Sequence, residues 1–247
     1  MRISCQICSA IALVLTLSPV AVLAQAPAPP PPPAREGTAE FAYVGTSGNS
    51  PTTSIGLGGE YIVRPDQWIV TTKAAYVRNE SENELKAESF DLVFKAARTL
   101  SPRLSAFGRY GFLHDRFAGI DARNIIEGGV SYVLVNAAPH SLTVDGSLGY
   151  AHESRVTPPD LSDPIAAAGA LYKLKLSDSV EISDDARFSV ALSNGDDWRL
   201  GNIASVNSKL TTVLSLKFSN TVRYVHAPVA TFQTTDTITA VALVAKF

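Results

Sequence analysis

The sequence predicts an all-β protein: a transmembrane antiparallel β-barrel of about 12 strands, preceded by a signal peptide and a Pro-rich spacer. Three observations favour this fold class. Segments of about ten residues alternate between apolar and polar side chains, short and longer polar connections follow one another in turn, and the chain ends on the alternating run TDTITAVALVAKF. An unpaired apolar strand at a chain end invites aggregation, so this last strand must pair with another one.

Residues 1–24 have the features of a cleaved export signal. Arg2 adds positive charge near the amino terminus, an apolar stretch runs from Ile7 to Leu17, and the segment ends on the small-x-small box Val-Leu-Ala. A membrane-spanning helix needs about 20 apolar residues, so this stretch is too short to be an anchor. Both cysteines of the sequence, Cys5 and Cys8, lie inside the signal, and we therefore expect a mature chain without thiols.

Residues 25–37 contain the run APAPPPPPA. Consecutive prolines form extended polyproline II rather than a packed element, so we interpret this segment as a periplasmic spacer. Binding of a partner that recognises polyproline is the alternative. The remaining residues, 38–247, are expected to form the barrel.

The alternation is clear near the carboxyl end, where Leu214, Leu216 and Phe218 share one face and Ser215 and Lys217 share the other. Strands of soluble sandwiches average about five or six residues, whereas a membrane-barrel strand needs about 9–11. The segments here have the greater length. They are expected at Thr38–Thr46, Thr52–Val63, Trp68–Arg78, Ala87–Arg98, Leu104–Asp115, Ala122–Val135, Ser141–Glu153, Ile165–Leu176, Val180–Ser193, Ile203–Leu210, Leu214–Val225 and Asp236–Phe247.

The connections predict the orientation of the barrel. RPDQ, TLSP, NAAPH, SDS and TTV are short turns, whereas NESENELK, RFAGI, SRVTPPDLSD, NGDDWRLGN and HAPVATFQTT are mostly longer and more polar. Short periplasmic turns and longer outer loops are typical of bacterial outer-membrane barrels. An even number of strands places both termini on one side. We therefore expect a multi-pass protein of the bacterial outer membrane with both termini in the periplasm.

The polar phase of the strands carries charges of both signs, which we expect to line the lumen. The candidates are Lys95, Arg109, Arg123, Glu127, Lys173, Lys175, Asp185, Arg187, Lys217 and Arg223. They could form a salt-bridged filling or line a pore. An eight-stranded barrel is filled by side chains and a 16-stranded one is open, so a barrel of about 12 strands lies between these cases.

The sequence offers little support for other chemistry. The four histidines lack metal-ligand spacing, so no metal site is expected. Gly56, Gly58 and Gly59 lie in an alternating segment with no helix after it, which excludes a nucleotide loop. The formal net charge of −2 and the absence of a basic patch argue against nucleic acid. Asp196 and Asp197 fit a solvated turn better than a cation bridge to lipopolysaccharide. We expect no cofactor and no catalytic residues.

Three stretches together resemble one family: YVGTSGNS (43–50), FGRYGFLHDRFAGIDAR (107–123) and the closing TDTITAVALVAKF. The family consists of outer-membrane proteins that share a domain of unknown function and are often labelled salt-induced outer membrane proteins. The resemblance implies a non-enzymatic role in the cell envelope, in response to salt or osmotic stress. It also implies outer-membrane lipids, lipopolysaccharide and the barrel assembly machinery as partners. The terminal Phe247 resembles the assembly signal of outer-membrane barrels generally.

Two other functions stay open. One is a narrow diffusion channel for small solutes through the charged lumen. The other is a lipid hydrolase at the outer rim, where His152, Glu153 and Ser154 follow one another and His114 lies at a similar level. Acyl-transfer chemistry requires a nucleophile and a base within hydrogen-bond reach, and no paired motif here provides them.

Overall fold

The computed structural model describes residues 32–247 except 48–51 and 82–83, so the expected signal peptide and most of the spacer lie outside the described residues. Within them the chain forms twelve strands and one 3₁₀ helix, η1 (Arg116–Ala118). The strands are β1 (Arg35–Ser47), β2 (Thr52–Val63), β3 (Trp68–Ser81), β4 (Glu84–Thr99), β5 (Leu104–Asp115), β6 (Ile120–Ala137), β7 (His140–Arg155), β8 (Leu161–Lys175), β9 (Val180–Ala191), β10 (Trp198–Lys209), β11 (Leu214–Val225) and β12 (Thr235–Lys246).

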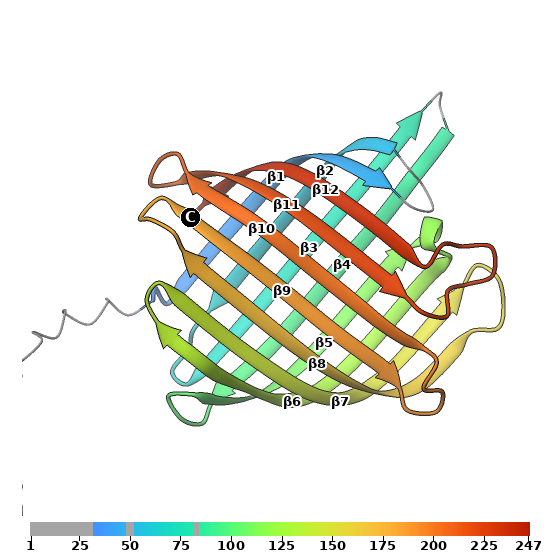
Figure 1. Cartoon of the computed structure of the whole chain (residues 1–247), viewed down its shortest axis with the longest axis horizontal. Coiled ribbons are helices and arrows are strands. Elements are labelled where there is room, and N and C mark those ends of the chain that lie inside the picture. Colours follow the sequence, from blue (N-terminus) through green and yellow to red (C-terminus); the bar gives the residue numbers. More distant parts are fainter. Residues whose placement is uncertain (1–31, 48–51, 82–83) are drawn as a thin grey trace, which may run out of the picture. The chain divides into compact units, whose positions relative to one another are not determined.

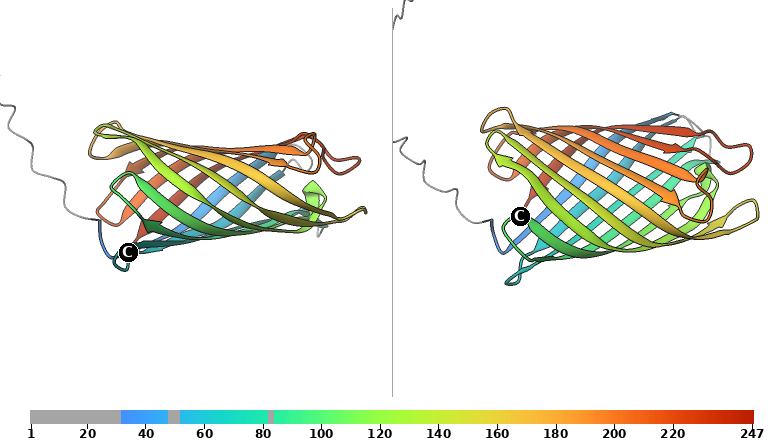
Figure 2. Two further views of the ribbon diagram at one scale, coloured as in Figure 1. Left: turned by 90° about the horizontal axis from the view of Figure 1, so that it is seen from below. Right: turned by 60° about the horizontal axis from the view of Figure 1, so that its bottom comes forward.

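The strands form one closed antiparallel barrel in which each strand pairs with its neighbours in the chain (Figures 1 and 2). The barrel closes because β12 pairs with β1, with Thr38 opposite Lys246 and Ser47 opposite Thr237. Closure satisfies the edges of both strands, so the apolar carboxyl-terminal segment is not left unpaired. The predicted all-β, 12-stranded antiparallel barrel is thereby confirmed.

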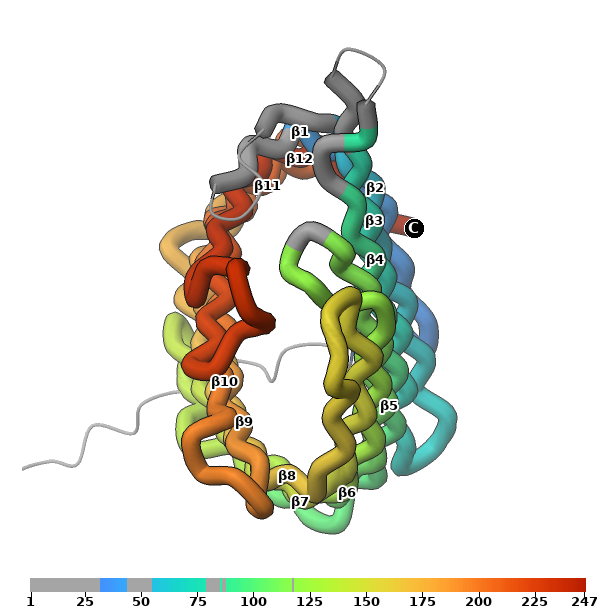
Figure 3. The backbone as a smooth tube through the Cα atoms, turned by 90° about the vertical axis from the view of Figure 1, so that its right-hand side faces the viewer, coloured from blue at the N-terminus to red at the C-terminus, as the bar shows by residue number. Residues whose placement is uncertain are grey.

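Two ends of the barrel can be distinguished. The terminal end holds the start of β1 and Phe247, which exchange two backbone hydrogen bonds through Gly37. The turns at this end are short, at residues 64–67, 100–103, 138–139, 176–179 and 210–213. At the opposite end, called the loop end, η1 and the β11–β12 connection lie near each other, and the backbone view looks onto this end (Figure 3).

Some predicted boundaries were wrong at the loop end. Most of the segment NESENELK is strand, because β3 continues to Ser81 and β4 begins at Glu84. Likewise β10 begins at Trp198 rather than Ile203. Gly201 and Asn202 interrupt the alternation there. The outward Asn202 donates a hydrogen bond to Asp184 Oδ1, which lets a polar side chain occupy an outward position.

The outer face of the barrel is apolar. Side chains of alternate strand residues point outward and are exposed, including Phe41, Leu57, Ile126, Leu148 and Leu243. Their neighbours along the strands point inward, because side chains of a strand alternate between its faces. None of the described helices is long and apolar enough to cross a membrane.

Candidate functional site

The inner face of the barrel carries most of its hydrogen-bonded charges, and Glu127 on β6 lies at the centre of one group. Its carboxylate accepts a hydrogen bond from Arg109 Nη1 at 2.8 Å and is 2.7 Å from Arg187 Nη2 through both oxygens. Arg109 lies opposite Glu127 on β5, whereas Arg187 comes from β9. Arg187 also reaches Asp145 Oδ2 at 3.3 Å. Only 1% of the Glu127 side chain is exposed, so these partners replace water around its charge.

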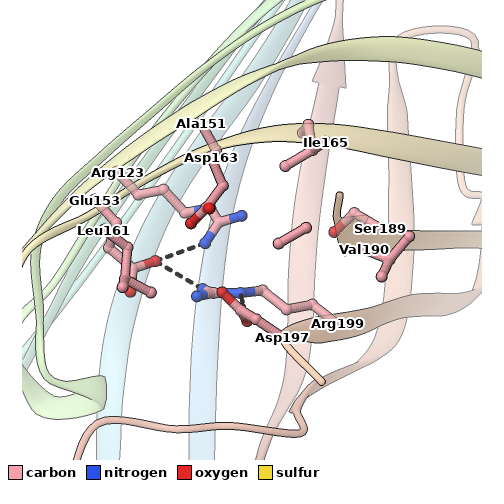
Figure 4. Close-up of a pocket in the computed structure, with 11 residues that line it drawn as sticks. Arg123, Ala151, Glu153, Leu161, Asp163, Ile165, Ser189, Val190, Asp197 and Arg199 are labelled. Atoms are coloured by element: carbon pink, nitrogen blue, oxygen red, sulfur yellow. Dashed lines mark hydrogen bonds and ion pairs between the residues drawn. The ribbon is translucent and has the colours of Figure 1, made fainter. Parts of the chain in front are cut away.

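A second group repeats this arrangement one strand further along the barrel (Figure 4). Glu153 on β7 accepts from Arg123 Nη1 of β6 at 2.6 Å and lies 2.8 Å from Arg199 Nη1 of β10. Arg155 Nε donates to its other oxygen at 2.7 Å. The Glu153 side chain is 2% exposed. In both groups one arginine comes from the strand that precedes the glutamate, and another comes from the strand three positions after it. The eight residues of these two groups are called the packed cluster: Arg109, Arg123, Glu127, Asp145, Glu153, Arg155, Arg187 and Arg199.

Glycines on the inner face make room for the packed cluster. A Cβ at Gly149 would lie 2.2 Å from the Ile126 carbonyl oxygen and 2.8 Å from Glu127 Cγ. A Cβ at Gly169 would lie 2.7 Å from Asp145 Oδ1. Contacts this short cannot be accommodated in a packed interior. These two glycines therefore allow the carboxylate side chains to lie against the barrel wall.

Ion pairs also join non-adjacent strands outside the packed cluster. Arg223 Nη1 of β11 lies 3.4 Å from Asp115 Oδ2 of β5, and these strands are opposite each other in the barrel order. Lys217 of β11 donates to Glu40 of β1 at 2.9 Å. At the loop end Val229, in the β11–β12 connection, is buried next to Gly119, which follows η1. The lumen is thus narrowed at several levels.

A different part of the inner face is accessible to solvent. Lys73 of β3 pairs in register with Glu60 of β2, and its side chain is 50% exposed. Ala75 lies on the same face of β3 and is exposed. Ile203, an inward residue of β10, is 43% exposed although it lies within the strand. Glu60, Lys73, Ala75, Ile203 and the inward Gly58 of β2 are called the open surface.

The predicted lumen residues fall on the inner phase of their strands. Arg109, Arg123, Glu127 and Arg187 come together in the packed cluster. Lys95 contacts the Phe107 ring, with its Nζ 4.1 Å from the ring centroid, and Asp185 lies near it. The others are distributed along the wall. Lys217 pairs with Glu40 two strands away, Arg223 pairs with Asp115 across the lumen, and Lys173 and Lys175 are exposed near the terminal end of β8.

Sequence reasoning missed Arg199, Glu40 and the inward position of Glu153. Arg199 lay in a segment interpreted as a loop. Glu153 is in phase with Asp145 and Ser147, so the alternation of β7 contained the signal that places it inside. Asp197, interpreted as a solvated turn residue, lies 3.4 Å from Arg199 Nε. It therefore belongs to the charged lining of the lumen.

The small cavity beside the packed cluster is too small for a solute. It is lined by residues that include Glu153, Asp163 and Arg199 (Figure 4). The volume in which the centre of a water molecule can lie is about 10 Å³. That space corresponds to roughly one water molecule. Across the described part of the chain, no group of three or more His, Cys, Asp and Glu side chains could hold a metal ion.

The outer rim residues raised by the hydrolase alternative point outward, apart from Glu153. His152 lies opposite Ser162 on β8, and its Nδ1 is 2.7 Å from Ser162 Oγ. Its hydrogen-bond partner is therefore Ser162 and not Ser154. On the other side His152 faces Asn124, whose Oδ1 accepts a hydrogen bond from the Tyr110 hydroxyl at 2.7 Å.

The terminal Phe247 lies at the other end of the barrel. Its ring covers Gly37, where a Cβ would lie 2.4 Å from Phe247 Cε2. The side chain is still 75% exposed. Phe247 therefore contributes little packing and remains accessible from outside.

Comparison with known proteins identifies the family. Residues 39–247 match the family described as "Protein of unknown function, DUF481", and the chain belongs to that family. No curated protein sequence matches it.

Solved structures show the same fold at low sequence identity. The NanC porin is 6% identical, with a TM-score of 0.59 over 85% of this chain and 100% of the porin. The translocator domain of the autotransporter NalP from Neisseria meningitidis is 15% identical, with a TM-score of 0.53 over 88% of this chain and 90% of that domain. At these identities the likeness concerns the barrel alone.

Proposed function

We propose that this member of the DUF481 family is an integral barrel of the bacterial outer membrane, without enzymatic activity, that encloses a narrow water-filled path for small hydrophilic solutes. Two features support insertion in a bilayer. The barrel satisfies its strand edges by closure, and its outer face presents exposed apolar side chains such as Leu57, Ile126 and Leu148. In hydrocarbon the only viable sheet is a closed one with an apolar exterior.

The observation that carries the channel is the exposure of Lys73. This residue is the sixth of β3, counted from the terminal end, and it points inward, yet half of its side chain is accessible to solvent. A lumen filled completely by side chains would cover it. Water therefore reaches the middle of the barrel along the open surface.

The path is narrow because charged side chains occupy the rest of the lumen. The packed cluster connects β5 and β6 to β9, and β6 and β7 to β10, and the Asp115–Arg223 pair joins opposite walls. Of the two possibilities left by the sequence, a charged filling and a pore lining, the geometry supports both in different parts of one lumen.

Conductance across a planar bilayer tests this proposal. Purified folded protein should give discrete unitary currents. Ala75→Trp places a large side chain on the open surface and should reduce the unitary conductance by about half or more, since pore size limits flow. Ala74→Trp is the matched control, because Ala74 is the adjacent residue and points outward. It should conduct like the wild type. Folded protein without conductance would exclude the channel.

Cellular location is a separate part of the proposal. We expect the protein in the outer-membrane fraction with Gln25 as its first residue and both termini in the periplasm, in contact with lipids and lipopolysaccharide. An epitope inserted in residues 156–160, at the loop end, should then be accessible to antibody on intact cells, whereas one in the turn at residues 100–103 should not. The opposite labelling would reverse the orientation. The salt or osmotic stress role stays a prediction.

Lipid hydrolysis is a second candidate, which the 2.7 Å contact between His152 and Ser162 favours. Under the main proposal, an active-site fluorophosphonate should not label the protein. Labelling that is lost in Ser162→Ala but kept in Ser154→Ala would instead assign a serine hydrolase. Ser154 is the appropriate control because it follows His152 by two residues on the same strand.

A further inference from the structure

We infer that the water-filled path selects small anions over cations, because the charges of the lumen that remain exposed are mostly lysines. This inference rests on the proposed channel and specifies what passes through it. It concerns the stretch between the packed cluster and the terminal end of the barrel.

Five inward lysines on the strands are exposed: Lys73, Lys173, Lys175, Lys209 and Lys246. Lys73 belongs to the open surface, Lys173 and Lys175 lie near the terminal end of β8, and Lys209 ends β10. The register places all five on the inner phase, since Lys73 faces Glu60, Lys173 faces Ser183, Lys175 faces Glu181, Lys209 faces Ser215 and Lys246, which ends β12, faces Thr38.

The carboxylates of the same face are less exposed. Glu127 and Glu153 are enclosed by arginines, and Glu40 is covered by Lys217. Asp91, opposite Ala75, and Asp185 are both half-buried, and Asp185 interacts with Lys73, Lys95 and Arg187. Glu181 is exposed between the lysines of β8 and β10, and Glu60 is 34% exposed with its Oε1 3.4 Å from Lys73 Nζ. The lysines therefore outnumber the carboxylates that water can reach.

This distribution is a consequence of side-chain chemistry. An arginine presents a planar fork that holds carboxylates in fixed pairs, whereas a lysine is a flexible and strongly hydrated point charge. The arginines neutralise the buried carboxylates in the packed cluster, and the lysines keep their charge in the water of the lumen. A charged lining of one sign concentrates ions of the opposite sign in a confined path. The expected solutes are small hydrated anions, from chloride to short carboxylates.

Reversal potentials in a KCl gradient across a planar bilayer test the inference. Wild-type protein should pass chloride more readily than potassium, by about threefold or more at 0.1 M salt, and the preference should weaken at 1 M because screening shortens the reach of each charge. Lys73→Gln combined with Lys173→Gln should bring the ratio close to one. Arg98→Gln is the control, since Arg98 is an exposed cation that faces outward opposite Trp68.

The outcomes separate the inference from the function on which it rests. Anion preference that is lost in the double variant and kept in Arg98→Gln supports it. Unitary currents without anion preference, or a preference that survives the double variant, overturn the inference and leave the channel in place. Folded protein that gives no current refutes both.

Discussion

The packed cluster and the open surface face the same lumen but are built differently. In the packed cluster, the Glu127 and Glu153 side chains are 1–2% exposed, and each is held by one arginine from the adjacent strand and one from the strand three positions away. On the open surface, Glu60 and Lys73 come from adjacent strands, lie 3.4 Å apart and remain in contact with water. The cluster joins distant walls and stabilises the closed barrel, whereas the open surface leaves inward side chains accessible to solvent. A barrel of intermediate width can thus combine a filled part with an open part.

Among the substitutions that compare the packed cluster with the open surface, removing the charge of Glu127 should lower the free energy of unfolding the most. Glu127→Gln leaves Arg109 and Arg187 without their shared anion in a nearly dry site. Breaking a buried pair in this way costs about 3–5 kcal/mol. The free energy of unfolding, measured by urea titration of the protein in lipid vesicles, should fall by that amount.

The matched change on the open surface is Glu60→Gln. Its ion pair is partly solvated, so the loss should be about 1 kcal/mol or less. Similar losses for Glu127→Gln and Glu60→Gln would show that the two regions do not differ in the way described.

A second comparison uses two adjacent alanines of β3. Ala74 points outward and Ala75 lies on the open surface. An arginine facing lipid near the bilayer midplane costs about 2–4 kcal/mol, so Ala74→Arg should reduce stability by that amount. Ala75→Arg places the charge in water and should change the stability by less than about 1 kcal/mol, a small effect typical of solvated substitutions. Equal sensitivity to urea would contradict the assignment of faces.

Glycine substitutions should also lower the stability more in the packed cluster than on the open surface, but by a smaller amount. Gly149→Ala forces a methyl group against the Ile126 carbonyl and Glu127, and overpacking of this kind costs about 1–3 kcal/mol. Gly58, on the open surface, has Glu40 Cβ at 3.6 Å from a built Cβ, which is ordinary contact. Gly58→Ala should therefore stay within about 0.5 kcal/mol of the wild type. Thermal unfolding of both variants in the same detergent provides the comparison.

Deletion of Phe247 should have the smallest effect on stability. A fully buried Phe contributes about 1.5–3 kcal/mol, and this ring is largely exposed, so the purified chain should refold almost normally. If assembly machinery recognises the residue, cells should accumulate unfolded protein in the periplasm. Impaired refolding in vitro would mean that Phe247 is structural, and normal assembly in cells would remove the recognition role.

The fold was largely predictable because alternation with a period of two determines both a strand and its faces. The bounds of β2, β5 and β11 agree with the prediction at Thr52–Val63, Leu104–Asp115 and Leu214–Val225. The start of β10 was missed because Gly201 and Asn202 interrupt the alternation, and only the partner Asp184 shows how Asn202 is accommodated. Ends of strands depend on such cross-strand contacts, which are not local in sequence.

The candidate site was predictable only in part. Alternation assigns Glu127 and Arg187 to the inner face, but it does not indicate that they meet. Their contact depends on the curvature of the closed barrel, which brings β9 within reach of a long side chain on β6. The division of the lumen into packed and open parts has the same origin. It depends on glycines such as Gly149, whose role becomes clear only when the opposite backbone is placed.

The pairing of β1 with β12 has a consequence for the way the barrel forms. Every other strand pairing joins neighbours in the chain, so hairpins can form early with short loops. The β1–β12 seam joins the two ends of the barrel sequence, from Thr38 opposite Lys246 to Ser47 opposite Thr237. Its closure carries the largest loop entropy, so we expect it to come last, when all twelve strands are in place. Until then both edge strands stay unsatisfied, and a chain that stops short of its final strand remains an open sheet that is prone to pair with others.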